Sequence, residues 1–395
     1  MNDVFRGIID AQAENLLSGY HSDDPFFFAT PEHTLLTRGH YATVPQPSSG
    51  SSLSETVDLA LKQARERGHP NPIVVGAIPF DTGQAARLSI PHHVLSAGPL
   101  TRRAASAPLR TPKCTVTPQP APQVYAEGVA QAVRQIQDGV LRKVVLARTL
   151  ELASEEAIDV PCLLERLARR NTHGYTFALN LAATGQGTLV GASPELLLSR
   201  RGLQVRSNPL AGSAARVREP LADAQRSQAL LLSTKDLHEH QLVADAVAQG
   251  LRPHCKVLEV PAAPSLIHTE TMWHLSSDIR GELASPEASA LFLASCLHPT
   301  PAVCGYPSDQ ALALIRQIEP FNRGFYSGMV GWCDAEGNGE WVVTLRCALV
   351  QGQHMRLFAG AGVVAESQPT SELAETSAKF KTMLNALGMA AQETL

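Results

Sequence analysis

The pattern of apolar and polar residues in the first third of the chain predicts short strands around one helix. The helix is expected over residues 55–67, and apolar runs favour strands at residues 26–28, 35–37 and 73–80. Two connectors rich in proline and serine are predicted at residues 44–54 and 102–123, but they do not by themselves mark separate domains. Because these strands are too few for an independent core, we expect residues 1–122 to contribute strands to a core shared with residues 123–391.

Beyond residue 123 the pattern predicts hairpins with helices between them. Helices are expected at 125–138 and 235–250. The expected strands are 143–152 and 175–181, then one hairpin formed by 187–191 and 196–205, and a second formed by 340–349 and 354–359. Since strands and helices do not alternate regularly, the prediction is an α+β fold, with large antiparallel sheets stacked in the core of a single domain and helices packed outside.

Composition and charge narrow the classes of function. The 395 residues are 44% hydrophobic, enough for one large core or two ordinary ones. A formal net charge of −4 and the absence of basic runs argue against nucleic-acid binding. No apolar stretch reaches the ~20 residues of a membrane helix, and Asp3, Asp10 and Glu14 fall where a secretory signal would be apolar, so we expect a cytoplasmic protein that binds no membrane. The cysteines include no C-x-x-C pair, so neither a disulfide framework nor a zinc ribbon is predicted.

Two charged residues beside apolar runs are candidates for acid–base chemistry. Lys143 begins a predicted strand, where it either reaches solvent or, if desolvated, has a lowered pKa and acts as a general base. Glu195 lies between the apolar runs 188–190 and 196–198. It is either an exposed turn residue or a buried carboxyl whose raised pKa suits a general acid. The pattern alone leaves both alternatives open.

Acidic residues in two predicted helices are candidates for binding a cation. Glu239 lies near the start of a helix that Ser233 can cap, and its neighbouring histidines lack the H-E-x-x-H spacing of a zinc site. In the last helix, Glu372 and Glu375 share a face with Lys379. These residues form either a solvated ion-pair ladder or a site for a hard cation such as Mg²⁺, which takes one or two protein carboxylates.

A glycine pair near the C-terminus matches a dinucleotide-binding pattern weakly. Residues 360–365 read G-x-G-x-x-A after a predicted strand. A Rossmann unit needs a helix that begins within the glycines and a second strand after it, whereas Pro369 intervenes and too little chain follows. We therefore expect a tight turn at Gly360, with backbone N–H groups that can face a carboxylate.

Seven segments together resemble the chorismate-utilising enzymes, which include anthranilate, aminodeoxychorismate, isochorismate and salicylate synthases. They occur in family order over the last two thirds of the chain: KVVLAR at 143–148, GASPE at 191–195, PLAGSA at 209–214, KDLHEH at 235–240, HPTPA at 298–302, GAG at 360–362, and Glu372-x-x-Glu375-x-x-x-Lys379. Residues 76–81 add to this resemblance, and residues 331–343 look like the isochorismate synthases of catecholate siderophore pathways. The resemblance implies the family fold, with chorismate bound by residues 123–391.

Two positions bear on which nucleophile is used. Aminodeoxychorismate synthases typically carry a nucleophilic lysine where this chain has Ala211, and alanine cannot bond to the substrate ring. Branches that use water resemble this chain in carrying Lys143, where anthranilate synthases tend to have glutamine. The resemblance therefore implies addition of water, with no ammonia and no glutaminase subunit.

The implied reaction is Mg²⁺-dependent isomerisation of chorismate to isochorismate. Lys143 would activate the water that adds at C2, and Glu195 would protonate the departing C4 hydroxyl. By resemblance, Glu239 and Glu375 are the magnesium ligands. The residues implied to contact the substrate are Gly212, Ser213, His274, Ala302, Arg346, Gly360 and Lys379, with Arg346 and Gly360 at the enolpyruvyl carboxylate. A monomer that supplies 2,3-dihydroxybenzoate for a catechol siderophore is expected.

Two alternatives stay open at this point. Val303 and Tyr326 lie where the family varies, and changes there could permit pyruvate elimination, which would make the chain a salicylate synthase. A noncatalytic chorismate- or dinucleotide-binding protein would instead place Lys143 and Glu195 in solvent.

Overall fold

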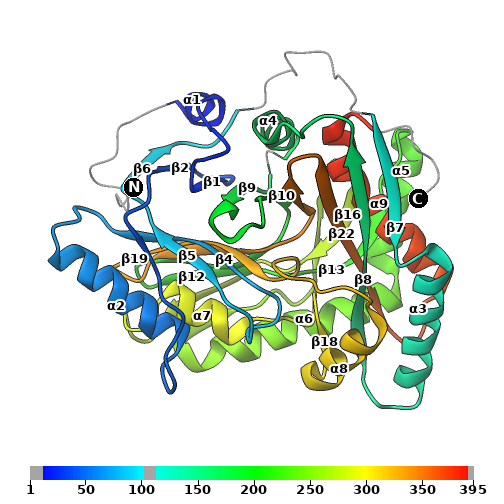
Figure 1. Cartoon of the computed structure of the whole chain (residues 1–395). Coiled ribbons are helices and arrows are strands. Elements are labelled where there is room, and N and C mark those ends of the chain that lie inside the picture. The colour runs from blue at the N-terminus through cyan, green and yellow to red at the C-terminus, as the bar shows by residue number, and fades with distance from the viewer. Residues whose placement is uncertain (1–11, 102–112, 172, 390–395) are drawn as a thin grey trace.

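Two large antiparallel sheets face each other in the computed structural model, which describes residues 12–101, 113–171 and 173–389 (Figure 1). Sheet A contains, in spatial order, β18 (Gly305–Tyr306), β8 (Lys143–Ser154), β22 (His354–Val363), β21 (Cys347–Gln351), β10 (Thr188–Ser193), β9 (Tyr175–Asn180), β1 (Phe26–Ala29), β2 (Thr34–Arg38) and β6 (His93–Ala97), and β7 (Cys114–Gln119) also pairs with β8. Sheet B contains β14 (Cys255–Glu259), β17 (Ile279–Leu283), β12 (Gln204–Asn208), β11 (Leu196–Arg201), β20 (Gly339–Val343), β19 (Met329–Asp334), β4 (Ile73–Ile78), β5 (Arg87–Ile90) and β3 (Ala42–Thr43). The smaller sheet C contains β13 (Leu210–Ala215), β16 (Met272–Ser276) and β15 (Ser265–His268).

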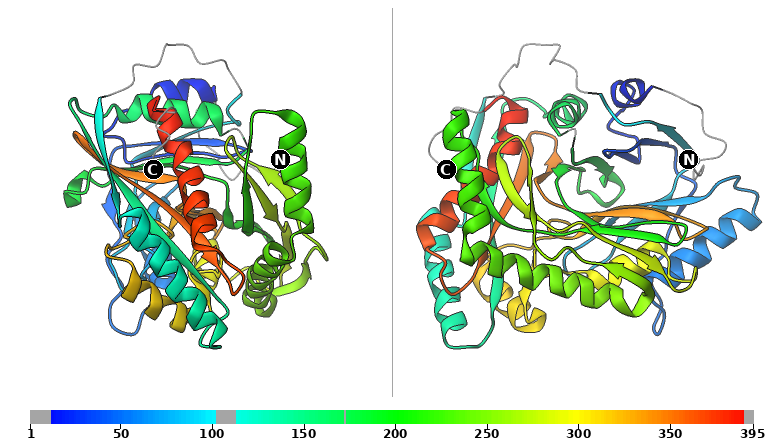
Figure 2. Two further views of the ribbon diagram at one scale, coloured as in Figure 1. Left: turned by 90° about the vertical axis from the view of Figure 1, so that its right-hand side faces the viewer. Right: turned by 180° about the vertical axis from the view of Figure 1, so that it is seen from behind.

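Helices cover the outer faces of both sheets, as Figures 1 and 2 show. The helices are α1 (Ala13–Ser18), α2 (Leu53–Glu66), α3 (Pro122–Gln137), α4 (Val160–Arg170), α5 (Pro220–Leu232), α6 (Thr234–Leu251), α7 (Ala290–Leu297), α8 (Ser308–Ile318) and α9 (Pro369–Leu387). Helices α2, α6 and α7 share a core with sheet B, whereas α1, α4 and α9 share one with sheet A. The predicted α+β class with antiparallel sheets and outer helices is confirmed.

The strands are apolar on both faces because each face is covered. Phe26 and Phe28 of β1 point between the sheets, where they share a core with Val75 of β4. Phe27 and Val74, one position away, point outward to the helices. Strands β1 and β4 belong to the first third of the chain and pair with β9 and β19, so the N-terminal residues form part of the same sheets as the later ones.

Two of the predicted strand connections are wrong. The expected hairpin of 187–191 with 196–205 does not form, because β10 belongs to sheet A and β11 to sheet B. The expected continuous strand 340–349 is divided in the same way between β20 and β21. The chain therefore crosses between the sheets at both of these points, and the predicted pairing of β21 with β22 is confirmed.

The two crossovers are bonded to each other. Ser193 Oγ donates to the carbonyl of Val343 at 2.6 Å, and the Val343 N–H donates to the carbonyl of Glu195 at 3.1 Å. Glu195 and Arg346 follow directly from these crossing points, so both lie where the sheets separate. The sequence predicted Arg346 within a strand, and this prediction is wrong. Arg346 lies in the β20–β21 connection and has φ 46°.

The predicted turn at Gly360 is also wrong. Strand β22 continues to Val363, with Gly360 opposite Ala147 and Gly362 opposite Val145 of β8. These glycines make space instead: a Cβ at Gly360 would lie 2.8 Å from the Tyr326 hydroxyl oxygen. No helix in the described ranges has the length and apolar character that a membrane crossing requires.

Candidate active site

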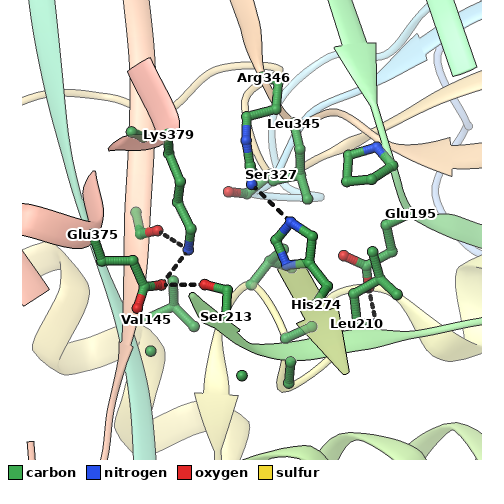
Figure 3. Close-up of a pocket in the computed structure, with 18 of the residues that line it drawn as sticks. Val145, Glu195, Leu210, Ser213, His274, Ser327, Leu345, Arg346, Glu375 and Lys379 are labelled. Carbon is green, nitrogen blue, oxygen red and sulfur yellow. Dashed lines mark hydrogen bonds and ion pairs between the residues drawn. The ribbon is translucent and has the colours of Figure 1, made fainter. Parts of the chain in front are cut away.

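A pocket lies where the two crossovers meet β8, β22, sheet C, α6 and α9 (Figure 3). Ten of the residues predicted from the sequence line it: Glu195, Gly212, Ser213, Glu239, His274, Ala302, Arg346, Gly360, Glu375 and Lys379. Segments far apart in the sequence are thus brought to one pocket.

Glu195 is a buried acid at one side of this pocket. It is 2% exposed, and the backbone N–H of Leu210 lies 3.5 Å from its Oε1. Burial raises the pKa of Glu195 to about 7, although the N–H of Leu210 and the charges of Lys143, Arg346 and Lys379 act in the opposite direction. The carboxyl can therefore carry a proton near neutral pH and donate it.

Lys143 lies just behind the pocket lining and is fully buried. Its Nζ is 2.9 Å from Glu239 Oε1. Burial acts to raise the pKa of Glu239, but the charge of Lys143 has the larger effect, so the pKa of Glu239 is lowered. Gly362 leaves room for this ion pair, because a Cβ there would lie 2.1 Å from Glu239 Oε1 and 3.2 Å from Lys143 Cε. The alternative of a solvent-facing lysine is thus excluded.

Arg346 lies beside His274 in the wall of the pocket. Arg346 Nη2 donates to His274 Nε2 at 3.2 Å. Burial, assisted by the charges of Arg346 and Lys379, lowers the pKa of His274 well below its usual value, so the imidazole is neutral and accepts this bond. Arg346 Nε is buried without a hydrogen-bond partner in the described part of the chain. This N–H is available to an anionic ligand.

Helix α9 supplies a second cation on the far side of the pocket. Lys379 Nζ donates to the carbonyl of Gly360 at 2.7 Å and pairs with Glu375 Oε1 at 2.6 Å. Ser213 Oγ donates to the same carboxylate oxygen at 2.9 Å. In Figure 3, Glu375 and Lys379 lie across the pocket from Glu195, with His274 and Arg346 between them. The pocket can therefore hold an anion between the acid Glu195 and the cation Lys379.

The candidate pair Glu372 and Glu375 is not a solvated ladder. Glu372 is 1% exposed and pairs with Lys235 Nζ at 2.7 Å, a partner the sequence analysis missed. Burial, followed by the charge of Glu375, raises the pKa of Glu372. Lys235 lies on α6 and Glu372 on α9, so no local spacing indicates this pair.

Several apolar and small residues of the pocket were also missed. They are Leu210 of β13, Phe358 of β22, and Ser327 and Leu345 in connections. Ser327 has φ 60°, a left-handed conformation rare for a residue with a Cβ. Nothing in the local pattern separates these residues from the core, since they lie within or beside apolar runs.

The chain belongs to the chorismate-utilising family, because the family model described as "Chorismate binding enzyme" matches residues 90–388. The isochorismate synthase DhbC of Bacillus subtilis (strain 168) is 51% identical over 390 residues, which cover 97% of this chain and 98% of that protein. The vibriobactin-specific isochorismate synthase of Vibrio cholerae is 44% identical over 384 residues, covering 97% and 96%. The family resemblance seen in the sequence is confirmed.

A solved structure supports the same assignment. The crystal structure of a putative 2,3-dihydroxybenzoate-specific isochorismate synthase, DhbC from Bacillus anthracis, matches with a TM-score of 0.91 and 50% identity. The match covers 95% of this chain and all of that one. A dinucleotide-binding fold is therefore not the fold of this protein.

Proposed function

We propose that this chain converts chorismate to isochorismate by adding water at C2 while the C4 hydroxyl leaves. The observation that carries the proposal is a buried lysine and a buried carboxyl of pKa about 7 around one pocket whose remaining polar groups suit a dicarboxylate. The isochorismate synthases named above, similar over nearly their whole length, support the same reaction.

The acid and the base have separate tasks in this proposal. Lys143 removes a proton from the attacking water, and Glu195 gives a proton to the C4 oxygen as the ring double bonds shift. The buried position of Glu195 favours its protonated form, which is the form the step requires. The 2.9 Å contact with Glu239 fixes where the Lys143 amine lies relative to the pocket, and the amine must lose its proton before it acts as the base.

The cationic groups bind the two substrate carboxylates. Arg346 Nε and the backbone of Gly360 hold the enolpyruvyl carboxylate, and Lys379 lies beside Gly360, to whose carbonyl it donates. Gly212, Ser213, Ala302 and His274 complete the wall around the ring.

The donor set fits one magnesium ion. Glu239 and Glu375 both present carboxylate oxygens to the pocket, and Mg²⁺ typically takes one or two protein carboxylates with water and substrate oxygens. In the described ranges no group of three or more His, Cys, Asp or Glu residues is placed to hold a metal ion. When bound, the ion would neutralise the ring carboxylate.

The cellular setting follows from the same relatives. We infer that the product supplies 2,3-dihydroxybenzoate for a catechol siderophore, in keeping with the names of the similar proteins. We further propose a monomeric cytoplasmic enzyme without a glutaminase subunit.

Product analysis tests this function. The purified full chain is incubated with chorismate in the presence of Mg²⁺ or of EDTA, and the products are separated by chromatography. Isochorismate that forms only with Mg²⁺ is the expected result. Salicylate and pyruvate as the dominant products, without a helper enzyme, would overturn the proposed product.

A further inference from the structure

A buried ion pair lies behind the pocket wall, in the connection between α8 and β19. Arg323 Nε donates to Glu319 Oε2 at 2.8 Å, and its Nη2 donates to Oε1 at 2.5 Å. The two side chains are 3% and 2% exposed. Burial alone would lower the pKa of Arg323, but Glu319 outweighs it and the pKa is raised. Arg323 is therefore charged, and two hydrogen bonds to one carboxyl group hold it in one geometry.

This ion pair lies against a gap in sheet A. Strand β8 pairs with β22 over residues 144–153. Along its other edge, β8 pairs with β18 only at residues 143–144 and with β7 only at residues 149–154. Among the described strands none pairs with that edge between these two segments, so its backbone groups need other partners.

Arg323 and Glu319 supply partners in this gap. Arg323 Nη2 donates to the carbonyl of Val145 at 2.7 Å, and the N–H of Ala147 donates to Glu319 Oε1 at 2.8 Å. Arg323 Nη1 also donates to the carbonyl of Val303 at 2.8 Å. One guanidinium thus joins the catalytic strand to the loop that follows α7, and every N–H-bearing nitrogen of its fork has an acceptor.

The atoms held in this way belong to the pocket. Val145 and Val303 line it, and so does Tyr326, whose ring centroid is 5.9 Å from the Arg323 guanidinium carbon. Because side chains alternate along a strand, fixing the backbone at Val145 also fixes where Lys143, two residues earlier, points.

We propose that Arg323, oriented by Glu319, is a positioning residue for the reaction: it fixes Lys143 and the Val303 wall relative to Glu195. This inference rests on the proposed function, because it assigns the chemistry to those side chains. Arg323 does not line the pocket. Its effect should therefore fall on the chemical step, since the carboxylates are held by Arg346 and Lys379.

The substitution Arg323→Lys tests the proposal. A lysine ammonium can pair with Glu319 but cannot also reach both carbonyls through a planar fork. We expect kcat to fall ~10- to 100-fold with KM changed less than about threefold, because sub-ångström misplacement of reacting groups is costly. Both constants are measured at low temperature, and kcat is calculated per folded molecule, with the folded fraction taken from circular dichroism.

Arg200→Lys is the matched control. Arg200 is also buried, 2% exposed, and does not line the pocket. It donates to four backbone carbonyls, those of Gly202, Pro286, Ala288 and Gly337. Its replacement should lower the melting temperature and leave kcat per folded molecule unchanged.

The outcomes separate positioning from simple stability. If Arg323→Lys lowers stability while kcat per folded molecule stays at the wild-type value, as for Arg200→Lys, the proposal is overturned. If Arg323→Lys does not fold, Glu319→Gln carries the test, because the amide retains an acceptor for the N–H of Ala147. Its kcat should fall about fivefold or more at similar KM, and an unchanged kcat would overturn the proposal. Failure of the proposed function is distinct, since the wild-type chain would then form no isochorismate.

Discussion

Replacing Glu195 by glutamine should abolish turnover and, at the same time, stabilise the folded chain at alkaline pH. Glutamine has nearly the same shape but cannot donate the carboxylic proton, so kcat should fall ~10²- to 10⁴-fold, the range that general acid catalysis typically supplies. In the wild-type enzyme, kcat/KM should decline as the pH rises through the Glu195 pKa of about 7, because only the protonated carboxyl can act.

The stability effect follows from the same buried carboxyl. Raising its pKa from 4.5 to about 7 costs the ionised form about 3 kcal/mol. Because the pKa is higher in the folded than in the unfolded chain, this cost is absent at low pH and grows until the pH exceeds the folded pKa. From pH 5 to pH 8 the wild-type chain loses about 2.5 kcal/mol that the glutamine variant does not lose.

Thermal unfolding of the two chains at pH 5 and pH 8, without substrate or metal, measures this difference. For a chain of 395 residues, the melting temperature of Glu195→Gln relative to the wild type should be about 3 °C higher at pH 8 than at pH 5. Glu340→Gln is the matched control, because burial also raises the pKa of Glu340 to about 7 and Glu340 does not line the pocket. It should show the same rise in relative melting temperature with normal turnover. A Glu195→Gln variant that keeps turnover within about threefold, or whose relative melting temperature does not rise, would refute the reasoning.

Three further changes test other parts of the site. Arg346→Lys should raise KM for chorismate ~10-fold or more, since lysine cannot form the bidentate pair, and an unchanged KM in steady-state assays would contradict that role. Gly362→Ala places a methyl group 2.1 Å from Glu239 Oε1 and should reduce turnover at least ~10-fold. Gly98→Ala is the control, because a Cβ at Gly98 has no atom within 4 Å, and its turnover should stay unchanged. Equal activities of the two variants would rule out the steric argument. Mg²⁺ should raise the melting temperature of the wild-type chain but not of Glu239→Gln, and an equal rise in both would remove Glu239 from the metal site.

Helices α2, α3, α6 and α9 could be predicted because their signals are local, whereas α1, α4, α5, α7 and α8 were not predicted. Ser233 accepts a hydrogen bond from the Asp236 N–H at 3.2 Å, so the predicted cap of α6 is confirmed. The sheets could not be assigned in the same way. Strands β10 and β11 are buried on both faces, and an apolar run does not indicate which of two sheets it joins. The crossings at Glu195 and Arg346 were therefore missed.

The site shows the same division. The family motifs indicated which residues gather in one pocket, and the apolar runs around Glu195 correctly allowed for a buried acid. The ion pair of Lys143 with Glu239 joins residues almost a hundred positions apart, and no local spacing indicates it. The contacts of Arg323 with the edge of β8 depend on a gap between strands, which appears only once the sheet is assembled.

Isotopic labelling tests the central claim, that water adds at C2 as the C4 hydroxyl departs, most directly. Chorismate is converted by the purified chain with Mg²⁺ in water enriched in oxygen-18, and the isochorismate is examined by mass spectrometry and NMR. The account predicts one solvent-derived oxygen, located on C2, and no product from Lys143→Ala. Isochorismate without the label, or full turnover by Lys143→Ala, would contradict it.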